Sequence, residues 1–268
     1  RHLVTAPNKR RMLVQLVAQP DCPLEVLLGS PELEGARVRT LSWKEIDHAE
    51  SGPVPSIARD FDLAYIMYTS GSTNEPKGIM HTHASGLSYA KWAHEVYGLR
   101  TEDRLTNHAP LHFDLSTFDF FAGALAGAAT VIVGDEYLKL PASYAQLLES
   151  EKITTFFTVP YALTQLLMRG ALEQRTLSAL RWVIFGGEPM PPKHLATLME
   201  VLPFARFSNM YGPAEVNGCT FYHVPRPLRD LNSPISIGTV SRNADYVIVD
   251  AEDQLIHDEK PGELLIRS

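Results

Sequence analysis

The chain has 268 residues, 45% of them hydrophobic and 21% charged, with a formal net charge of -7. This composition is typical of a globular protein with a sizeable core, and the length allows one large α/β domain or two smaller ones. The acidic balance argues against nucleic-acid binding, and the longest apolar run, 121–133, is too short to span a membrane. The two cysteines are too few for a disulfide framework, so we expect a cytoplasmic protein with no nucleic-acid or membrane partner.

The first sixty residues predict a helix at 13–18 and a strand at 26–29, followed by a proline-rich connector at 51–55. From residue 63 onward, short apolar runs alternate with segments of helical spacing. Strands are predicted at 63–68, 130–133, 154–159, 182–185 and 246–249, and helices at 84–96, 116–126, 143–150, 161–168 and 193–201. This alternation predicts an α/β fold with a mostly parallel sheet flanked by helices.

The residues from 248 to 266 break the alternation, and they predict a small antiparallel β appendage at the C-terminal end. We therefore expect a first segment at 1–60, a core α/β region at 61–235 and a β-rich segment at 236–268. The chain begins with Arg1 rather than Met and stops directly after a strand-like run, which predicts a piece of a longer protein.

The stretch TSGSTNEPKG, residues 69–78, follows the predicted strand at 63–68. Its glycines permit close backbone approach, so that N–H groups can point at an anion, and Lys77 adds a positive charge. Hydroxyl groups that suit phosphate oxygens come from Thr69, Ser70, Ser72 and Thr73. A polar surface turn is the alternative. A Walker-type loop is disfavoured, because Gly78 stands where a magnesium-binding hydroxyl would be needed.

Residues 63–73 together with Pro76-Lys77-Gly78 resemble the phosphate-loop signature of the adenylate-forming superfamily. That superfamily comprises acyl-CoA synthetases, luciferases and the adenylation domains of nonribosomal peptide synthetases. The resemblance implies the large N-terminal domain of such an enzyme, ATP as a substrate, and catalytic roles for Thr69 and Lys77. It also implies nucleotide contacts from Ser70, Gly71, Ser72 and Thr73. Asn74 departs from the family, which usually has glycine there, although asparagine tolerates left-handed backbone.

A second segment, 207–215, carries an aromatic ring, a fixed Gly-Pro turn and a carboxylate that could bind Mg²⁺. By resemblance, Asn209, Met210, Tyr211 and Gly212 contact the nucleotide, and Glu215 is the catalytic Mg²⁺ ligand. Gly186, Gly187 and Glu188 follow a predicted strand and resemble the family's adenine-side segment. A plain strand-to-helix turn would satisfy the same local chemistry.

Asp114 lies in a segment, 110–116, that resembles the superfamily's substrate-recognition segment. In amino-acid-activating members an aspartate here pairs with the substrate ammonium, and a buried cation does need a carboxylate partner. The alternative is that Asp114 caps the helix predicted from Ser116. The resemblance implies further substrate contacts from Leu115, Phe118, Phe157, Ile184, Gly186, Met210, Gly218 and Cys219. This set is uncharged and mostly apolar, which favours a small or medium apolar amino acid. His112 and Phe113 are further substrate-contact candidates as an aromatic gate, with a packed core aromatic as the alternative.

The resemblance as a whole implies an enzyme that forms aminoacyl-AMP and passes the acyl group to the phosphopantetheine thiol of a carrier protein. An acyl- or aryl-CoA ligase is one alternative, and a non-catalytic nucleotide-binding or interaction module is another. The family's later motifs are absent, so the fragment alone is expected to have weak activity or none. His81 and His83 have spacing that could hold a metal, but an exposed surface at the start of a helix is expected there.

Overall fold

The computed structural model describes residues 1–5, 9–30, 33, 37–53, 55–69 and 76–268. The chain divides into two compact units, Arg1–Ile57 and Ala58–Ser268. The first unit contains β1 (His2–Val4), α1 (Arg10–Val17), β2 (Val26–Leu28), β3 (Arg39–Leu41) and α2 (Trp43–Asp47). Its sheet is parallel, in the order β1-β2-β3.

The first unit buries a small apolar core in which Leu13 of α1 and Leu27 of β2 are almost fully covered. The predictions of a helix at 13–18 and a strand at 26–29 are confirmed, with ends shifted by a few residues. The sequence reading missed β1, β3 and α2. Each of these elements spans only three to five residues, which is too few to show a periodic pattern of apolar residues.

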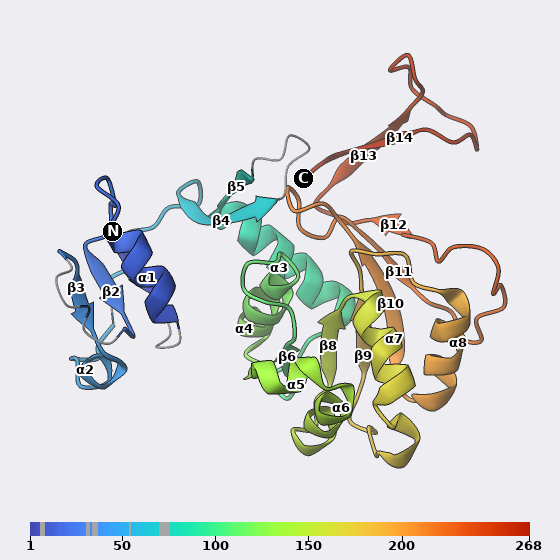
Figure 1. Cartoon of the computed structure of the whole chain (residues 1–268). Coiled ribbons are helices and arrows are strands. Elements are labelled where there is room, and N and C mark those ends of the chain that lie inside the picture. Colours follow the sequence, from blue (N-terminus) through green and yellow to red (C-terminus); the bar gives the residue numbers. More distant parts are fainter. Residues whose placement is uncertain (6–8, 31–32, 34–36, 54, 70–75) are drawn as a thin grey trace. The chain divides into compact units, whose positions relative to one another are not determined.

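The second unit contains most of the regular structure, shown in Figure 1. Its strands are β4 (Leu63–Thr69), β5 (Lys77–Thr82), β6 (Arg104–Asn107), β7 (Ala129–Ile132), β8 (Thr155–Thr158), β9 (Trp182–Phe185), β10 (Arg206–Tyr211), β11 (Thr220–His223), β12 (Thr239–Val240), β13 (Asp245–Val249) and β14 (Glu263–Arg267). Its helices are α3 (His83–Tyr97), α4 (Gly123–Ala126), α5 (Asp135–Lys139), α6 (Pro141–Ser150), α7 (Pro160–Arg169) and α8 (Pro192–Val201), with a π-helical turn η2 (Phe118–Ala122) and a 3₁₀ turn η3 (Leu172–Gln174).

The main sheet has seven strands in the order β12-β11-β10-β9-β8-β6-β7. The pairs β7–β6, β6–β8, β8–β9 and β9–β10 are parallel, whereas β11 and β12 join antiparallel. The predicted α/β fold with a parallel-rich sheet is therefore confirmed. Because the parallel strands all end at one edge, the loops that follow β6, β8, β9 and β10 gather there.

Helices cover both faces of this sheet, as Figure 1 shows. Successive strand residues point to opposite faces, so neighbouring side chains enter different cores. On β8, Phe156 packs into the core beneath α6, α7 and α8, whereas Phe157 enters the core beneath α3 and η2. On β9, Val183 and Ile184 divide in the same way. Strands buried on both faces explain the continuous apolar runs that the sequence shows.

The strand predicted at 63–68 exists as β4, but its expected place in the parallel sheet is wrong. Within the described residues, β4 pairs only with β5, as a two-stranded antiparallel hairpin. An apolar run does not reveal its pairing partner, because that depends on residues further along the chain. The sequence patterns do not predict the strands β5, β6, β10, β11 and β12. The helix predicted at 116–126 is observed as η2 followed by α4.

The antiparallel appendage predicted near the C-terminal end is confirmed, since β13 pairs with β14 from Asp245↔Arg267 to Val249↔Glu263.

In the part of the chain that the structure describes, no helix has the length and apolar character needed to cross a membrane.

A partly buried ion pair joins the amino-terminal ends of β6 and β9. Arg181 Nη1 lies 2.6 Å from both carboxylate oxygens of Asp103, and Asp103 also accepts hydrogen bonds from Thr154 Oγ1 and the Arg100 N–H. Burial alone would raise the pKa of Asp103, but these donors outweigh it and hold the pKa below its usual value.

We expect Asp103→Asn to lower the free energy of unfolding by roughly 2 kcal/mol at neutral pH, because Arg181 loses its charged partner. The pKa of Asp103 is lower in the folded state, so this stabilisation is present above the unfolded-state pKa and is lost as pH falls through the folded-state pKa. Urea unfolding of the variant and the parent at neutral and acidic pH measures the effect. An equal loss at every pH would contradict this account.

Candidate functional site

The loops at the carboxyl edge of the main sheet surround a cavity of about 200 Å³. It is lined by residues that follow β6 and β9, by residues within or directly after β8 and β10, and by one residue of α3. The lining residues are Tyr89, Phe113, Asp114, Leu115, Phe157, Val159, Gly187, Glu188, Met210, Gly212, Asn217 and Gly218. Nine of these belong to the predicted site, so sequence segments about a hundred residues apart meet at one place. Parallel α/β sheets commonly bind ligands at this edge.

Asp114 lies in a tight turn between β6 and η2. The turn is held by backbone bonds from Phe113 N to Pro110 O and from Thr117 N to Asp114 O, and Thr117 Oγ1 also donates to Asp114 O. The helix begins at Ser116, as predicted, and the Asp114 carboxylate interacts with the N–H of Leu115 directly before it. Asp114 also lines the cavity, so a place at the helix start and a place at the cavity are compatible.

Burial raises the pKa of Asp114, and the nearby Glu215 carboxylate raises it further. The N–H groups of Leu115 and Asp114, and His81, offset part of this rise. A half-buried carboxylate whose charge is poorly compensated is a favourable place for a cation, because a bound cation would restore the ionised state.

The wall of the cavity is close-packed around Met210 and Gly218. A Cβ added to Gly218 would lie 2.8 Å from Met210 Sδ and 3.1 Å from the rings of Trp92 and Tyr89, so a larger residue would have to displace them. The predicted residues Phe118, Ile184 and Cys219 are fully buried behind this wall, and they are not lining residues. They belong to the layer that supports the wall, which a position-by-position resemblance cannot distinguish from the lining itself.

The glycine pair after β9 has two different roles. Gly187 lines the cavity with a φ of +84°, a backbone conformation that favours glycine. Gly186 is not a lining residue, and a Cβ there would lie 2.2 Å from the Met210 carbonyl oxygen. Glu188 Oε2 accepts a hydrogen bond from the Tyr161 N–H at 3.1 Å, which fixes this loop against the start of α7.

The residues predicted to contact the nucleotide on and after β10 are only partly in the cavity. Met210 and Gly212 line it, whereas Tyr211 is 40% exposed and is not a lining residue. Asn209 is not a lining residue, and its Nδ2 donates to Ser236 O at 2.9 Å. His112 and Phe113 are both exposed, with ring centroids 5.1 Å apart, and only Phe113 reaches the cavity.

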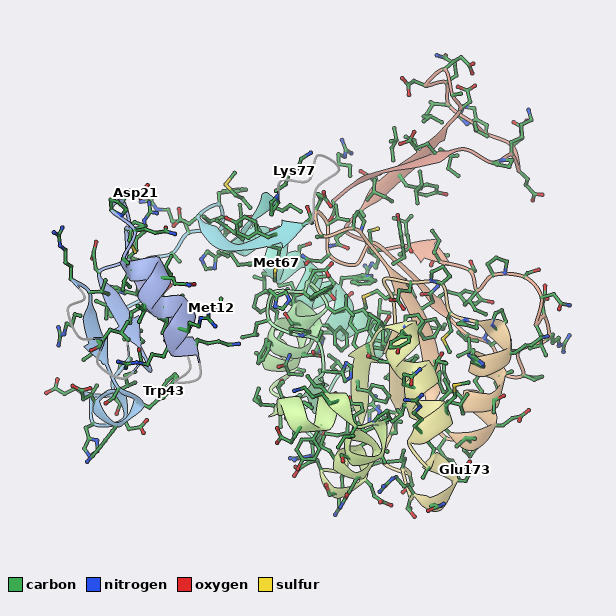
Figure 2. The ribbon with its side chains drawn as sticks, in the orientation of Figure 1. Met12, Asp21, Trp43, Met67, Lys77 and Glu173 are labelled. Carbon is green, nitrogen blue, oxygen red and sulfur yellow. The ribbon has the colours of Figure 1, made fainter. Side chains whose placement is uncertain are left out.

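The predicted phosphate loop connects β4 and β5. Thr69 and Lys77 are register partners at the end of this hairpin, so the two ends of the loop lie directly opposite each other. Figure 2 shows Lys77 at the start of β5. The predicted contacts from Ser70, Gly71, Ser72 and Thr73, and the departure at Asn74, lie outside the described residues.

A protein-only metal site is not formed: within the described ranges, no three histidine, cysteine, aspartate or glutamate side chains are grouped to hold an ion. Glu215 is exposed and lies near Asp114. One hard carboxylate fits Mg²⁺ that arrives with a nucleotide, since Mg²⁺ commonly takes one or two carboxylates and completes its shell with phosphate oxygens and water. The residues present therefore fit a nucleotide-bound ion and do not fit a resident one.

The sequence reading missed Tyr89, Val159 and Asn217 among the lining residues. Tyr89 lies on α3, and only its spacing on the buried face marks it. Asn217 has a positive φ of 56° and sits two residues after Glu215, so the glutamate motif was the signal nearest to it.

These observations define an α/β ligand-binding domain with an anionic cavity at the carboxyl edge of a parallel-rich sheet. The chain belongs to the family described as "AMP-binding enzyme", whose sequence pattern matches residues 4–268.

Two named carrier-protein ligases are among the proteins that this chain resembles in sequence. It is 36% identical over 200 residues to "L-proline--[L-prolyl-carrier protein] ligase" of Pseudomonas fluorescens, covering 74% of this chain and 40% of that protein. It is 28% identical over 251 residues to "D-alanine--D-alanyl carrier protein ligase" of Bacillus cytotoxicus, covering 90% of this chain and 50% of that protein. The chain thus spans half or less of the length of these two relatives.

Solved structures agree with the fold. A luciferase-like enzyme from the nonluminescent mealworm Zophobas morio has a TM-score of 0.82 at 20% identity, over 100% of this chain and 62% of that one. The nonribosomal peptide synthetase FmoA3, bound to alpha-methyl-L-serine-AMP, has a TM-score of 0.79 at 23% identity, over 97% of this chain and 29% of that one. The fold is therefore that of the N-terminal part of adenylate-forming enzymes.

Proposed function

We propose that the complete protein activates an amino acid with ATP and transfers it to the phosphopantetheine thiol of a carrier protein. The carboxylate of Asp114 at the cavity is the observation that carries the proposal. A substrate with an α-ammonium would neutralise it, whereas an acyl or aryl acid has no group that could do so. The names of the similar carrier-protein ligases, which refer to proline and D-alanine, support an amino-acid substrate.

The first step joins the two substrates. An oxygen of the amino-acid carboxylate attacks the α-phosphorus of ATP, a new P–O bond forms, and the bond to pyrophosphate breaks. Thr69 and Lys77 at the hairpin end would bind the β- and γ-phosphates, together with Ser70, Ser72 and Thr73. Glu215 would hold Mg²⁺, which supplies positive charge to the leaving pyrophosphate. In the second step the thiol attacks the acyl carbon, and AMP leaves.

The protein would contribute by positioning the two substrates and by supplying charges that pair with theirs. Asp114 would fix the ammonium end of the substrate, so that its carboxylate reaches toward the hairpin, where the phosphates bind. Tyr211 would stack on the adenine, and Gly187 lets the backbone approach it. Residues held this way accelerate a reaction between two bound substrates without covalent chemistry of their own.

We further propose that the amino acid is small or medium-sized and apolar. The cavity wall includes the side chains of Leu115, Phe157 and Met210 and the Gly218 backbone, and none of these four residues carries a charge. The Glu188 carboxylate also lines the cavity, but it is engaged by the Tyr161 N–H. Crowding at Gly218 limits the space available to the substrate side chain.

We also propose a nonribosomal-peptide-synthetase type of context and a cytoplasmic location. Substrates such as ATP and a reduced carrier thiol are available in that compartment. The net charge of -7 is consistent with the absence of a nucleic-acid partner.

The decisive test is a panel of amino acids in ATP–pyrophosphate exchange with the complete protein. Small apolar amino acids of the size of proline and alanine are expected to support exchange. The corresponding acids without an α-amino group are expected to fail. Exchange that is equally fast with the deaminated acids would favour an acyl- or aryl-CoA ligase. ATP binding without exchange for any acid would favour a non-catalytic module.

The raised pKa of Asp114 predicts how binding depends on pH. Asp114 must be ionised to pair with the ammonium, and its pKa in the free protein lies above the ordinary aspartate value. We therefore expect KM for the amino acid to rise as pH is lowered through this raised pKa, about tenfold per pH unit below it. KM for ATP, measured in parallel, should not show this inflection. A flat amino-acid KM over the same range would contradict the assignment.

A further inference from the structure

We propose that Tyr65 and His81, a stacked pair on the β4–β5 hairpin, are positioning residues. They hold the 214–217 segment at a fixed position relative to Thr69 and Lys77. This inference rests on the proposed function, because Thr69, Lys77, Glu215 and Asp114 are there assigned to ATP and to the amino acid. It adds a physical link between the two substrate sites.

The hairpin side of the link is regular. Tyr65 and His81 are register partners on neighbouring strands, and their rings stack with centroids 4.6 Å apart and planes 10° from parallel. His81 is only 3% exposed, so the expectation of an exposed surface at this position is wrong. Residues two apart along a strand point to one face, so Thr69 shares the face of Tyr65, and Lys77 shares the face of His81.

The other side of the link is the turn between β10 and β11. His81 Nε2 lies 2.9 Å from the Ala214 carbonyl oxygen, and because a carbonyl only accepts, Nε2 carries the proton. Asn217 Nδ2 donates to the Tyr65 hydroxyl at 3.0 Å. These two bonds bracket Glu215, the candidate Mg²⁺ ligand.

The second bond also determines which end of the Asn217 amide remains free. Its Nδ2 is engaged by Tyr65, and its Oδ1 is buried with no hydrogen-bond partner among the described residues. A buried acceptor without a donor is costly, and a substrate ammonium carries more N–H groups than one carboxylate can use. Asn217 and Asp114 line the same cavity, so the bond to Tyr65 fixes the Asn217 amide beside the candidate ammonium site.

The stacked pair therefore connects the candidate binding residues of both substrates. Through its strands it is continuous with Thr69 and Lys77, and through its hydrogen bonds it fixes Glu215 and Asn217. A ligand that orders one side of this link lowers the cost of ordering the other, and such coupling is reciprocal. We expect ATP and the amino acid to bind cooperatively, and we expect the cooperativity to depend on Tyr65 and His81.

Two conservative variants separate the contacts. Tyr65→Phe keeps the stacked ring and removes only the hydroxyl that Asn217 uses. His81→Phe keeps a ring in the stack, and it removes the Nε2 donor together with the effect of the imidazole on the pKa of Asp114. Tyr246→Phe is the matched control, because Tyr246 is 55% exposed on β13, away from the described cavity lining. Thermal unfolding of each variant establishes that it is folded.

The measurements are the dissociation constants of a nonhydrolysable ATP analogue and of the best amino acid of the panel, each alone and with the other present. Tyr65→Phe is expected to raise the amino-acid constant about 3- to 10-fold, with a smaller effect on the nucleotide. His81→Phe is expected to raise both constants by about the same factor, and in both variants the cooperativity should fall. The kcat for exchange should change less than KM. Tyr246→Phe should match the parent.

The outcomes distinguish this inference from the proposed function. If the parent shows amino-acid-dependent exchange and both variants retain its affinities and cooperativity, the positioning role is overturned and the function stands. If no amino acid supports exchange, but His81→Phe still weakens binding of the ATP analogue 3- to 10-fold, the function is overturned and the positioning role stands.

Discussion

Replacing Asp114 by alanine is expected to abolish amino-acid-dependent ATP–pyrophosphate exchange. Removing one partner of a half-buried charge pair costs about 2–5 kcal/mol, which corresponds to a fall in kcat/KM of roughly 30- to 5,000-fold. The loss should appear with every amino acid of the panel, because the ammonium is common to all of them. Exchange at the parental rate in Asp114→Ala would refute the amino-acid assignment.

Two controls make this loss specific. Binding of a nonhydrolysable ATP analogue should be retained in Asp114→Ala, because the nucleotide is assigned to other residues. The isosteric Asp114→Asn should lose exchange as well, and yet unfold at a higher temperature than the parent at neutral pH. The folded-state pKa of Asp114 in the parent is raised, so ionisation of this carboxylate destabilises the fold as pH rises. The neutral amide of the variant does not have this effect. Activity lost together with stability would instead indicate general damage.

The second large effect concerns Asp119, which lies on η2 and is fully buried. Both of its carboxylate oxygens lack a hydrogen-bond partner in the described part of the chain. Burial raises the pKa of Asp119 well above the usual value, and the nearby Asn107 side chain offsets part of this rise. The sequence reading gave no role to this residue, since an aspartate inside a predicted helix indicates nothing by itself.

We expect Asp119→Asn to increase the free energy of unfolding by roughly 1–3 kcal/mol at neutral pH. Because the folded-state pKa is raised, the native state retains a proton that the unfolded chain releases, so the parent loses stability as pH rises above the unfolded-state value. Asp119→Asn does not lose stability in this way as pH rises. The difference between the two should therefore vanish under acid conditions and grow toward neutral pH.

Urea unfolding of parent and variant from acid to neutral pH measures this difference, and subtracting the two curves removes the titrations that they share. Asp103→Asn is the matched comparison, because Asp103 is also buried but is paired with Arg181. Its substitution should act in the opposite direction, with a loss that grows toward neutral pH. A destabilised Asp119→Asn would mean that the carboxylate has a partner which stabilises its charge.

The sequence alone determined the fold class and most of the secondary structure that surrounds the cavity. Strands such as β8 and β9 are apolar on both faces, and the helices between them have the matching period, so local patterns were sufficient there. The segments containing Asp114, Gly187 and Met210 could also be found, because their residue types and order resemble a known family.

The tertiary structure alone decided how these segments are arranged. It removed β4 from the parallel sheet and paired it with β5, because strand pairing depends on contacts that no local window contains. It also divided the predicted pocket into lining residues and buried supports such as Phe118 and Cys219. The Tyr65–His81 stack and its bonds to Ala214 and Asn217 join positions more than 130 residues apart, and only folding brings such side chains within hydrogen-bonding distance.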